Sequence, residues 1–492
     1  MKKSTALALA IAALTGSAFA QDAAKVALLE AKLDSVSEKT DAVKGKLDGI
    51  EENYLETKAT VDKLAKIKVS GLIQARMEYA TDTAQLDAGF GANQARFKVR
   101  RGRLKVAHDG TLGDYAVQVQ YGEKGIELVD MYGSFQDPWK TVKVRLGAQD
   151  IPFGYEIGYS SSMMETMERS LAEQKLFNGE KDLGAVLFLS YDKDFFQYVD
   201  FKAGVMNGQM NIKTQENDEG KTFLGRLGFK APIKDLNFEI DGGASYYMNE
   251  LTVRNKSVVD YDNQVGGTKE TAKIAYTVAN AVDLKLEKTI IGADMQAYFN
   301  ILPFGGTVLR GEMYTGTNVS VANNGPYTGD ISTTVSYNTT YTTTADTAKK
   351  AYTTKSVDPK ASAGAYVRPV MGWYGTLIQN VGDAFQVVAR YEQFDPNTEL
   401  EGSAIGSHNS VKGVIGSADD LSWSQISLGL NYFLSGNVKL SLAYDIKVNE
   451  TTSAANVVNL NTKDGKNTTT PRTDWSKEID NNLLTAQLQY KF

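Results

Sequence analysis

From Ile67 to the last residue, apolar and polar side chains alternate with a period of two. In the segment IKVSGLIQARMEY, residues 67–79, the odd-numbered positions are mostly apolar or small and the even-numbered ones mostly polar. The same alternation recurs in DYAVQVQY, TVKVRLGA, FLGRLGFK, AFQVVARYEQF and NLLTAQLQYKF. Successive side chains of a β-strand point to opposite faces, so the pattern predicts strands with one apolar and one polar face.

Sixteen such segments can be delimited along the chain. They are expected at 67–79, 95–108, 114–122, 126–136, 142–150, 183–191, 198–207, 222–230, 236–249, 288–300, 306–316, 364–379, 383–395, 421–434, 437–449 and 481–492. The connections that follow even-numbered segments are short, such as DPWK, LPFG and SGN, whereas most of the others are long. This asymmetry is typical of bacterial outer-membrane barrels and is rare in a soluble β-sandwich, which alternates too.

The predicted fold class is therefore all-β: a 16-stranded antiparallel transmembrane β-barrel formed by residues 67–492. A ring of sixteen strands is wide enough to leave an aqueous lumen, whereas one of eight would be filled by side chains. The chain ends in Tyr490 and Phe492, aromatic residues typical of the C-terminal signal of such barrels. The expected partners of the barrel are outer-membrane lipid and small solutes.

Residues 21–66 have a helical periodicity instead. Apolar residues recur at alternating spacings of three and four without a slip in register, which predicts a coiled coil rather than one helix packed on a globular domain. The positions of this seam are Val26, Leu29, Leu33, Val36, Thr40, Val43, Leu47, Ile50, Tyr54, Thr57, Val61 and Leu64. The β-branched residues at the d positions disfavour a parallel dimer. We predict a trimeric coiled coil and hence a homotrimer.

The first twenty residues, MKKSTALALAIAALTGSAFA, have the features of a secretory signal peptide. Lys2 and Lys3 precede a short apolar stretch, and Ala18-Phe19-Ala20 forms a small-residue cleavage site. We therefore expect residues 1–20 to be removed on export, and the coiled coil, 21–66, to lie in the periplasm.

Composition narrows the possible functions. The chain has no Cys and only two His, so we expect neither disulfides nor a metal site nor a cofactor. His108 and His408 fall in different parts of the pattern, and no nucleophile and base are brought together, so no enzyme activity is expected. The net charge of −6 argues against a nucleic-acid binder.

The second predicted strand carries ARFKVRRGRLK, six cations within residues 95–105. Alternation places Arg96, Lys98 and Arg100 on the face opposite Ala95, Phe97 and Val99. A charged side chain facing lipid at mid-bilayer costs about 2–4 kcal/mol, so the cations are expected to face the lumen. After Arg101-Gly102 the apolar residues fall on even numbers, which indicates a β-bulge that returns the following cations to the inside.

A ladder of inward cations in an aqueous lumen favours anions. The planar guanidinium of Arg also matches the oxygens of phosphate. The predicted pore-lining, anion-binding residues are Arg96, Lys98, Arg100, Arg103, Lys105, Lys143, Arg145 and Arg226.

The pieces FKVRRGRLKV, YAVQVQYGEKGIELVDMYGSF, VRLGAQDIPFGYE and MERSLAEQ lie between Arg96 and Asp192. Together they resemble the phosphate-selective porin O and P family, as does QISLGLNYFLSGNVKLSLAYDI further on. The resemblance implies a 16-stranded trimeric porin whose third loop, here 151–182, folds inward as a constriction. It also implies that the arginine ladder draws phosphate toward that constriction.

The predicted constriction loop is not basic, unlike a loop built to hold phosphate. Its carboxylates outnumber its cations, and the candidate charged residues at the constriction are Glu165, Glu168 and Arg169. Ser160, Ser161 and Ser162 have hydroxyl groups that can donate to an oxyanion, although such a serine run is also typical of flexible loops.

Three functions follow from these observations. The first is an outer-membrane porin for passive diffusion of small solutes, with a bias toward phosphate-like anions. The second is a general, non-selective pore, in which a basic wall faces an acidic loop. The third is structural: the coiled coil binds peptidoglycan and tethers the outer membrane to the cell wall.

Overall fold

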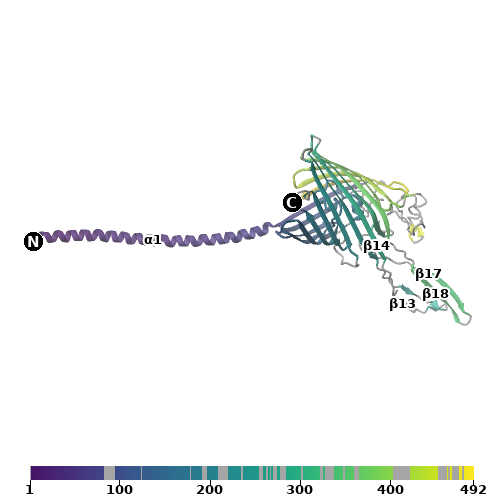
Figure 1. Cartoon of the computed structure of the whole chain (residues 1–492), viewed down its shortest axis with the longest axis horizontal. Helices are drawn as coiled ribbons and strands as arrows, with labels where there is room; N and C mark the ends of the chain where they lie inside the picture. Colours follow the sequence, from purple (N-terminus) through teal and green to yellow (C-terminus); the bar gives the residue numbers. More distant parts are fainter. Residues whose placement is uncertain are drawn as a thin grey trace. The chain divides into compact units, whose positions relative to one another are not determined.

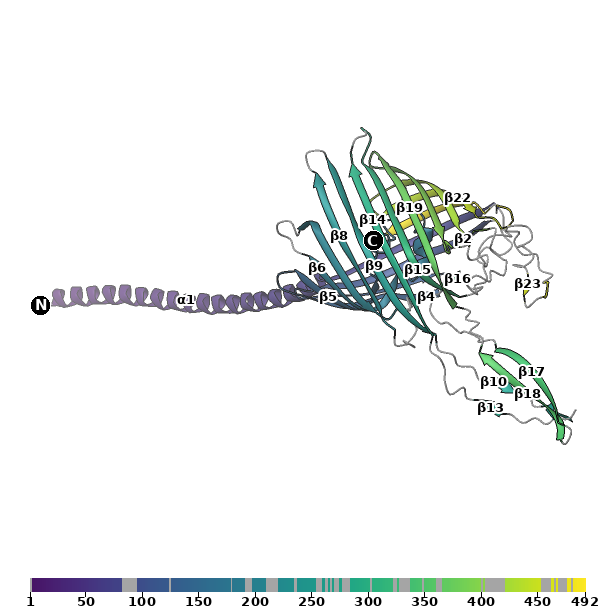
Figure 2. The ribbon, with the colours of Figure 1, turned by 45° about the vertical axis from the view of Figure 1, so that its right-hand side comes forward.

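The computed structural model of the chain consists of two units, Met1–Ile67 and Lys68–Phe492. It describes residues 2–81, 95–123, 125–177, 179–190, 197–208, 220–233, 237–253, 259–261, 264–265, 268–269, 274–276, 284–300, 303–321, 325–326, 337–346, 349–359, 365–399, 401–402, 421–452, 462–463, 466–467, 476–478 and 481–492. The helices and strands of both units are drawn in Figure 1, and more of the strands are labelled, from a second direction, in Figure 2. The predicted loop residue His408 lies outside the described residues.

The first unit is a single α-helix, α1, Lys2–Ala65. It includes residues 21–66 almost entirely, so the helix predicted there is confirmed, and it also includes most of the predicted signal peptide. The apolar side chains of the seam are exposed, as at Val43, which is 64% exposed. Exposure of an apolar seam of this length to water is unfavourable, because burying each Val, Leu or Ile side chain stabilises a structure by about 1.5–3 kcal/mol. None of the described helices is long and apolar enough to cross a bilayer.

The second unit is a closed antiparallel sheet. The sheet has 17 strands, of which β16, Gly325–Pro326, spans only two residues beside β15. The other 16 form the ring: β1 Ile67–Ala80, β2 Ala95–Asp109, β3 Asp114–Gly122, β4 Gly125–Gln136, β5 Val142–Asp150, β6 Lys181–Ser190, β7 Val199–Met206, β8 Thr222–Ile233, β9 Phe238–Val253, β14 Leu284–Phe299, β15 Thr307–Val321, β19 Ala365–Val381, β20 Phe385–Asp395, β21 Trp423–Phe433, β22 Val438–Asn449 and β25 Leu483–Lys491.

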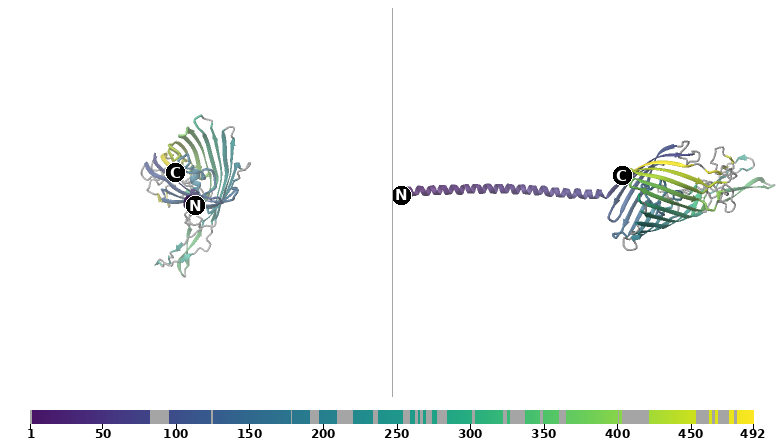
Figure 3. Two further views of the ribbon diagram at one scale, coloured as in Figure 1. Left: turned by 90° about the vertical axis from the view of Figure 1, so that its left-hand side faces the viewer. Right: turned by 90° about the horizontal axis from the view of Figure 1, so that it is seen from above.

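Each strand of the ring pairs with the next, and β1 pairs with β25 from Leu72↔Lys491 to Ala80↔Leu483. The wall therefore curves round on itself without a free edge (Figure 3). The predicted 16-stranded antiparallel barrel is confirmed. The bounds differ from the predicted ones by a few residues, most at β15, which continues to Val321.

Four small hairpins stand apart from the ring in the long connections. They are β10 Val259–Tyr261 with β13 Ile274–Tyr276, β11 Gln264–Val265 with β12 Thr268–Lys269, β17 Tyr337–Asp346 with β18 Lys349–Pro359, and β23 Thr462–Lys463 with β24 Lys466–Asn467. The Thr-rich tract that the sequence assigned to a long loop thus contains the β17–β18 hairpin.

Side-chain exposure alternates along the strands of the ring. In β1, Gln74, Arg76 and Glu78 are buried while Ile73 and Met77 are exposed. In β2 the exposed positions are odd-numbered up to Val99 and even-numbered at Leu104 and Val106. The switch falls between Val99 and Leu104, where Arg100 and Arg101 are not exposed. The outer surface of the barrel is therefore apolar, and its polar and charged side chains point inward.

We expect the exposed seam of α1 to be covered by other copies of the helix. Replacing Val43 and Ile50 by Asp removes about 1.5–3 kcal/mol of apolar burial per site and puts charge in the seam. The thermal midpoint of the helical circular dichroism signal of the full chain should then fall and lose its dependence on protein concentration. Leu55→Asp is the matched control, since Leu55 is as exposed but lies outside the repeat; equal effects of all three changes would exclude a seam.

Candidate functional site

The connection between β5 and β6 lies inside the ring of strands. It hydrogen-bonds to Gln74 of β1 through the Ser161 carbonyl, and its Gly154 N–H donates to Ser245 of β9 at 2.9 Å. It also contacts β22, where Lys439 donates to the Met164 carbonyl at 2.7 Å. Because β1 and β9 are on opposite sides of the 16-stranded ring, the segment from Ile151 to Glu180 crosses its interior. We call this segment the inner loop.

An apolar cluster holds the inner loop against one side of the wall. Phe153 and Phe177 of the loop are buried and lie 4.6 Å apart between ring centroids. They pack on Tyr247 of β9 and Tyr314 of β15. The cluster also includes the short helix α2, Leu171–Leu176, through Ala172 and Leu176. Burying these side chains in the loop fixes it against the wall from β6 to β20.

Carboxylates of the wall accept hydrogen bonds from backbone N–H groups of the inner loop. Glu312 of β15 accepts from the Tyr155 and Glu156 N–H groups at 2.9 and 3.2 Å, and Glu392 of β20 accepts from the Leu171 N–H at 2.8 Å. Gly154 has φ 63°, and a side chain there would collide with the Glu312 carboxylate. This contact is the physical reason for glycine in the PFG sequence.

A buried ion pair joins the inner loop to β20. Arg390 donates to the Glu156 carboxylate at 2.7 Å and to the Glu168 carbonyl at 3.3 Å. Both side chains of the Arg390–Glu156 pair are almost fully buried. Glu156 also accepts from the Ser170 N–H at 2.8 Å, and the Ser170 hydroxyl caps the start of α2. The pair therefore orders both the wall and the turn that precedes the helix.

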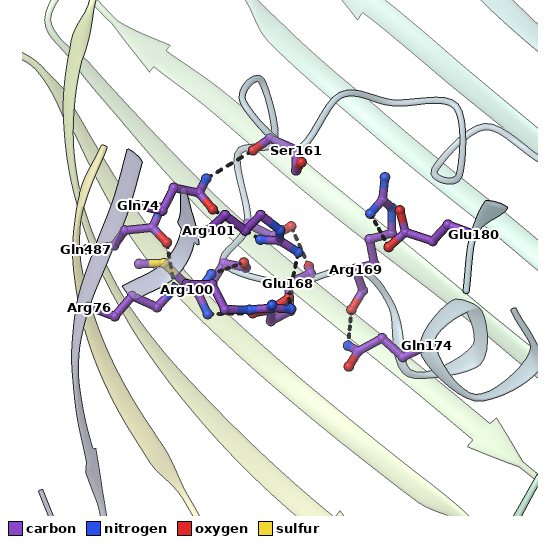
Figure 4. A network of polar contacts seen from close by, with 12 residues as sticks. Gln74, Arg76, Arg100, Arg101, Ser161, Glu168, Arg169, Gln174, Glu180 and Gln487 are labelled. Carbon is purple, nitrogen blue, oxygen red and sulfur yellow. Dashed lines mark hydrogen bonds and ion pairs between the residues drawn. The ribbon is translucent and has the colours of Figure 1, made fainter. Parts of the chain in front are cut away.

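At β1 and β2, across the lumen from β9, three guanidinium groups converge on one carboxylate of the inner loop (Figure 4). Arg100 binds Glu168 in bidentate fashion, at 2.6 and 2.9 Å. Arg76 reaches the same carboxylate at 2.5 Å and Arg101 at 3.5 Å. Burial alone would raise the pKa of Glu168, but these guanidinium groups hold the pKa well below its ordinary value. The guanidinium groups therefore favour the ionised form of this carboxyl group.

The cations predicted to line the pore do lie on less exposed, inward faces of their strands, but most have carboxylate partners. Arg96 and Lys98 share Glu78 at 2.8 and 2.9 Å, and Lys105 lies 3.8 Å from Asp130. The remaining pairs are Lys143 and Arg145 with Asp114, and Arg226 with Asp294. Among the predicted ladder, Arg103 is bound to neutral groups, the Gln120 side chain and the Ser161 hydroxyl.

The other predicted loop residues have different roles. Ser161 links the loop to β2, whereas Ser160 and Ser162 bond to each other through their hydroxyls at 3.0 Å. Glu165 pairs with Arg310 of β15 at 2.8 Å. Arg169 donates to three carbonyls of its own loop and pairs with Glu180 at 2.5 Å. Arg169 thus holds the loop's shape.

Several inward cations were not among the predicted pore-lining residues. Arg101 was assigned to the bulge itself. Arg310 and Arg390 are single cations in their strands, and Lys288 and Lys439 each share a strand with one further Lys. Extending the alternation rule to each strand would have placed Arg310 on the same face as Glu312, two residues on. Among the described residues no group of three or more His, Asp or Glu is arranged to hold a metal ion.

No family model matches the chain, and no curated protein sequence matches it either. The predicted membership of the phosphate-selective porin O and P family is thus not supported by these comparisons. Solved structures do superpose on the barrel. An anion-selective porin from Comamonas acidovorans is 12% identical, with 87% of this chain and 99% of that chain covered at a TM-score of 0.45.

Two further solved structures have similar values. OmpF from Salmonella typhi in complex with daunomycin is 11% identical, with 87% and 97% of the two chains covered at a TM-score of 0.46. The outer-membrane channel DcaP of Acinetobacter baumannii is 9% identical, with the same coverage and a TM-score of 0.44. With TM-scores below 0.5, these likenesses do not assign the chain to any of those groups.

The Arg390–Glu156 pair should be a strong contributor to barrel stability. Arg390→Met leaves Glu156 buried among other carboxylates, which for one half of a buried pair costs about 3–5 kcal/mol. Unfolding by urea in lipid vesicles measures the loss. Lys202→Met is the control, because Lys202 and Asp200 form an exposed pair worth about 0–1 kcal/mol. Similar small losses in both variants would contradict the role assigned to Arg390.

The buried carboxyl of Glu173 on α2 should make stability depend on pH. Burial and the carboxylates of Glu180 and Glu156 raise its pKa well above the ordinary value, and its Oε1 atom has no hydrogen-bond partner. A raised folded-state pKa means that ionisation opposes folding, so stability falls as pH rises above the unfolded pKa. Glu173→Gln should raise the unfolding midpoint at pH 8 and leave it unchanged at pH 4. Glu52→Gln, on exposed α1, is the control and should change neither midpoint. The prediction is refuted if Glu173→Gln does not raise the unfolding midpoint at pH 8 above that of the unaltered chain.

Proposed function

We propose that the chain is an outer-membrane porin, a water-filled channel for passive diffusion of small solutes. The observation that carries the proposal is the closed ring of 16 strands with an apolar outer surface and a charged interior crossed by the inner loop. A closed sheet leaves no backbone group unpaired in lipid, and a ring of this size encloses more space than side chains alone fill. The inner loop then acts as the constriction.

A modest preference for anions is the second part of the proposal. The wall from β1 to β5 carries about half of the described inward cations on fewer than a third of the strands, and Arg103 among them is bound to neutral partners. Carboxylates on the same wall and on the inner loop offset most of the other positive charges. This pairing of cations with carboxylates supports a weak anion bias over strict phosphate selectivity. If the carboxylates offset all of the inward positive charge, the channel is a general, non-selective pore.

The third part concerns assembly and location. The exposed seam of α1 supports a homotrimer formed through residues 21–66 in the periplasm, after removal of residues 1–20. Attachment of this helix to peptidoglycan stays a prediction of the sequence, and no contact in the described chain bears on it.

The reversal potential of the purified protein in a planar bilayer under a KCl gradient tests the proposal. We expect conduction with a chloride-selective sign. A unit positive charge about 8 Å from a permeating ion contributes about 0.5 kcal/mol in water, favourable for chloride and unfavourable for potassium, so Arg103→Gln should reduce the chloride-to-potassium permeability ratio about sixfold. Lys68→Gln is the control, because Lys68 is exposed and paired with Asp109. Absence of conduction would refute the porin, and a potassium-selective sign would refute the anion bias.

A further inference from the structure

Two of the three arginines around Glu168, Arg76 and Arg101, are also held by neutral groups that do not depend on that carboxylate. Arg76 donates to Gln487 of β25 at 2.6 Å and to the Met167 carbonyl at 2.5 Å. Arg101 donates to Gln74 of β1 at 3.1 Å. These contacts hold the guanidinium groups of β1 and β2 side by side (Figure 4). The cationic half of the cluster is thus built into the wall.

Glu168 and Arg100 are the partly exposed members of the cluster. The side chains of Arg76 and Arg101 are 2% and 5% exposed, whereas Glu168 is 31% and Arg100 29% exposed. Glu168 comes from the inner loop and the arginines from the wall. Of the two partly exposed groups, Glu168 is therefore the one that can leave the cluster without changing the wall.

Charge within the cluster is unbalanced. Three guanidinium groups face one Glu168 carboxylate, and the nearest other carboxylate, Glu78, lies 3.8 Å from Arg76. Glu78 is itself bound more closely by Arg96 and Lys98. Partly desolvated positive charge in excess attracts a further anion more strongly than the same charges do in water.

We infer that Arg76, Arg100 and Arg101 form an oxyanion-binding site, in which Glu168 is an internal ligand that exchanges with the carboxylate or phosphate group of a permeating solute. The inference rests on the proposed porin function and narrows its solutes to those that carry such a group. Arg100 and Glu168 already show the geometry, two parallel N–H···O contacts between a planar fork and two oxygens. A spherical chloride ion cannot reproduce them.

Exchange requires only the Glu168 side chain to move. The backbone at this position is held on both sides: the Glu168 carbonyl accepts from the Thr166 hydroxyl at 2.9 Å and from Arg390. Asn431 of β21 holds the nearby Glu165 carbonyl at 2.9 Å. Rotation of an exposed side chain away from the wall frees the three guanidinium groups, while the inner loop keeps its position.

The test is to remove the internal ligand and titrate oxyanions into the conducting channel. In Glu168→Ala and Glu168→Gln, the concentration of phosphate or succinate that halves the KCl conductance should fall about tenfold, the equivalent of one charge-assisted hydrogen bond. Phosphate and succinate distinguish phosphate from carboxylate solutes. Raising chloride instead should show no such gain.

Glu165→Gln is the matched control. It removes one loop carboxylate as well, but leaves a single guanidinium, Arg310, which lies over the rings of Tyr155 and Tyr159. It should shift the reversal potential without a tenfold gain in oxyanion block. Equal gains in Glu165→Gln and Glu168→Ala would show a plain charge effect and overturn the site.

Binding measured directly keeps the inference separate from the proposed function. Isothermal titration of phosphate and succinate into the detergent-solubilised full chain does not require conduction, and circular dichroism reports whether each variant keeps its β structure. A wild-type protein that never conducts refutes the porin alone. If both Glu168→Ala and Glu168→Gln fold but bind neither phosphate nor succinate more tightly than the wild type, the oxyanion site alone is refuted. If only Glu168→Gln folds, the titration of that variant decides.

Discussion

The pairing of β1 with β25 is the constraint on which the rest of the structure depends. It gives the first and last strands of the ring a partner, so that every long strand of the barrel has two neighbours. In a bilayer an unpaired strand edge would leave backbone N–H and C=O groups without water, at several kcal/mol for each group. Once the ring is closed, the alternation of each strand has a fixed meaning: one face meets lipid and the other meets the interior.

The width of a 16-stranded ring creates a second requirement, because side chains alone do not fill it. The inner loop meets this requirement with two kinds of contact. Phe153 and Phe177 pack on aromatic side chains of the wall between β9 and β15, while Arg76 and Arg100 bind Glu168 from β1 and β2. An apolar contact on one side and a charged one on the other give the loop a single orientation, since reversing it would separate Glu168 from its guanidinium partners and expose the apolar cluster.

The sequence predicts the ring closely and the charge pairing poorly, for a physical reason. Strand identity depends on neighbours two residues apart, so alternation alone locates β2 and places the switch of its exposed face at Arg101-Gly102, within a residue of where exposure changes in the structure. A salt bridge depends on groups far apart in the chain: Arg390 and Glu156 are separated by 234 positions. The ladder of cations was visible, but its pairing with Glu78, Asp114 and Asp130 could be assigned only once the register of neighbouring strands was known. The apolar seam of α1 needed no such information, because its repeat is local.

Glu168 and Glu312 show how environment separates two residues of the same type in one lumen. Glu312 is buried, accepts N–H groups of the inner loop and is enclosed by that loop, so no solute reaches it without unfolding the loop. Glu168 is partly exposed and faces guanidinium groups that keep their positions through Gln74 and Gln487. A carboxylate with a structural role is buried, and its hydrogen-bond donors have no other partner. A carboxylate that can be displaced is accessible, and its donors are also held by other groups. By this criterion Glu168 is the place in the lumen where the wall's positive charge can be transferred from the protein's own carboxylate to that of a solute.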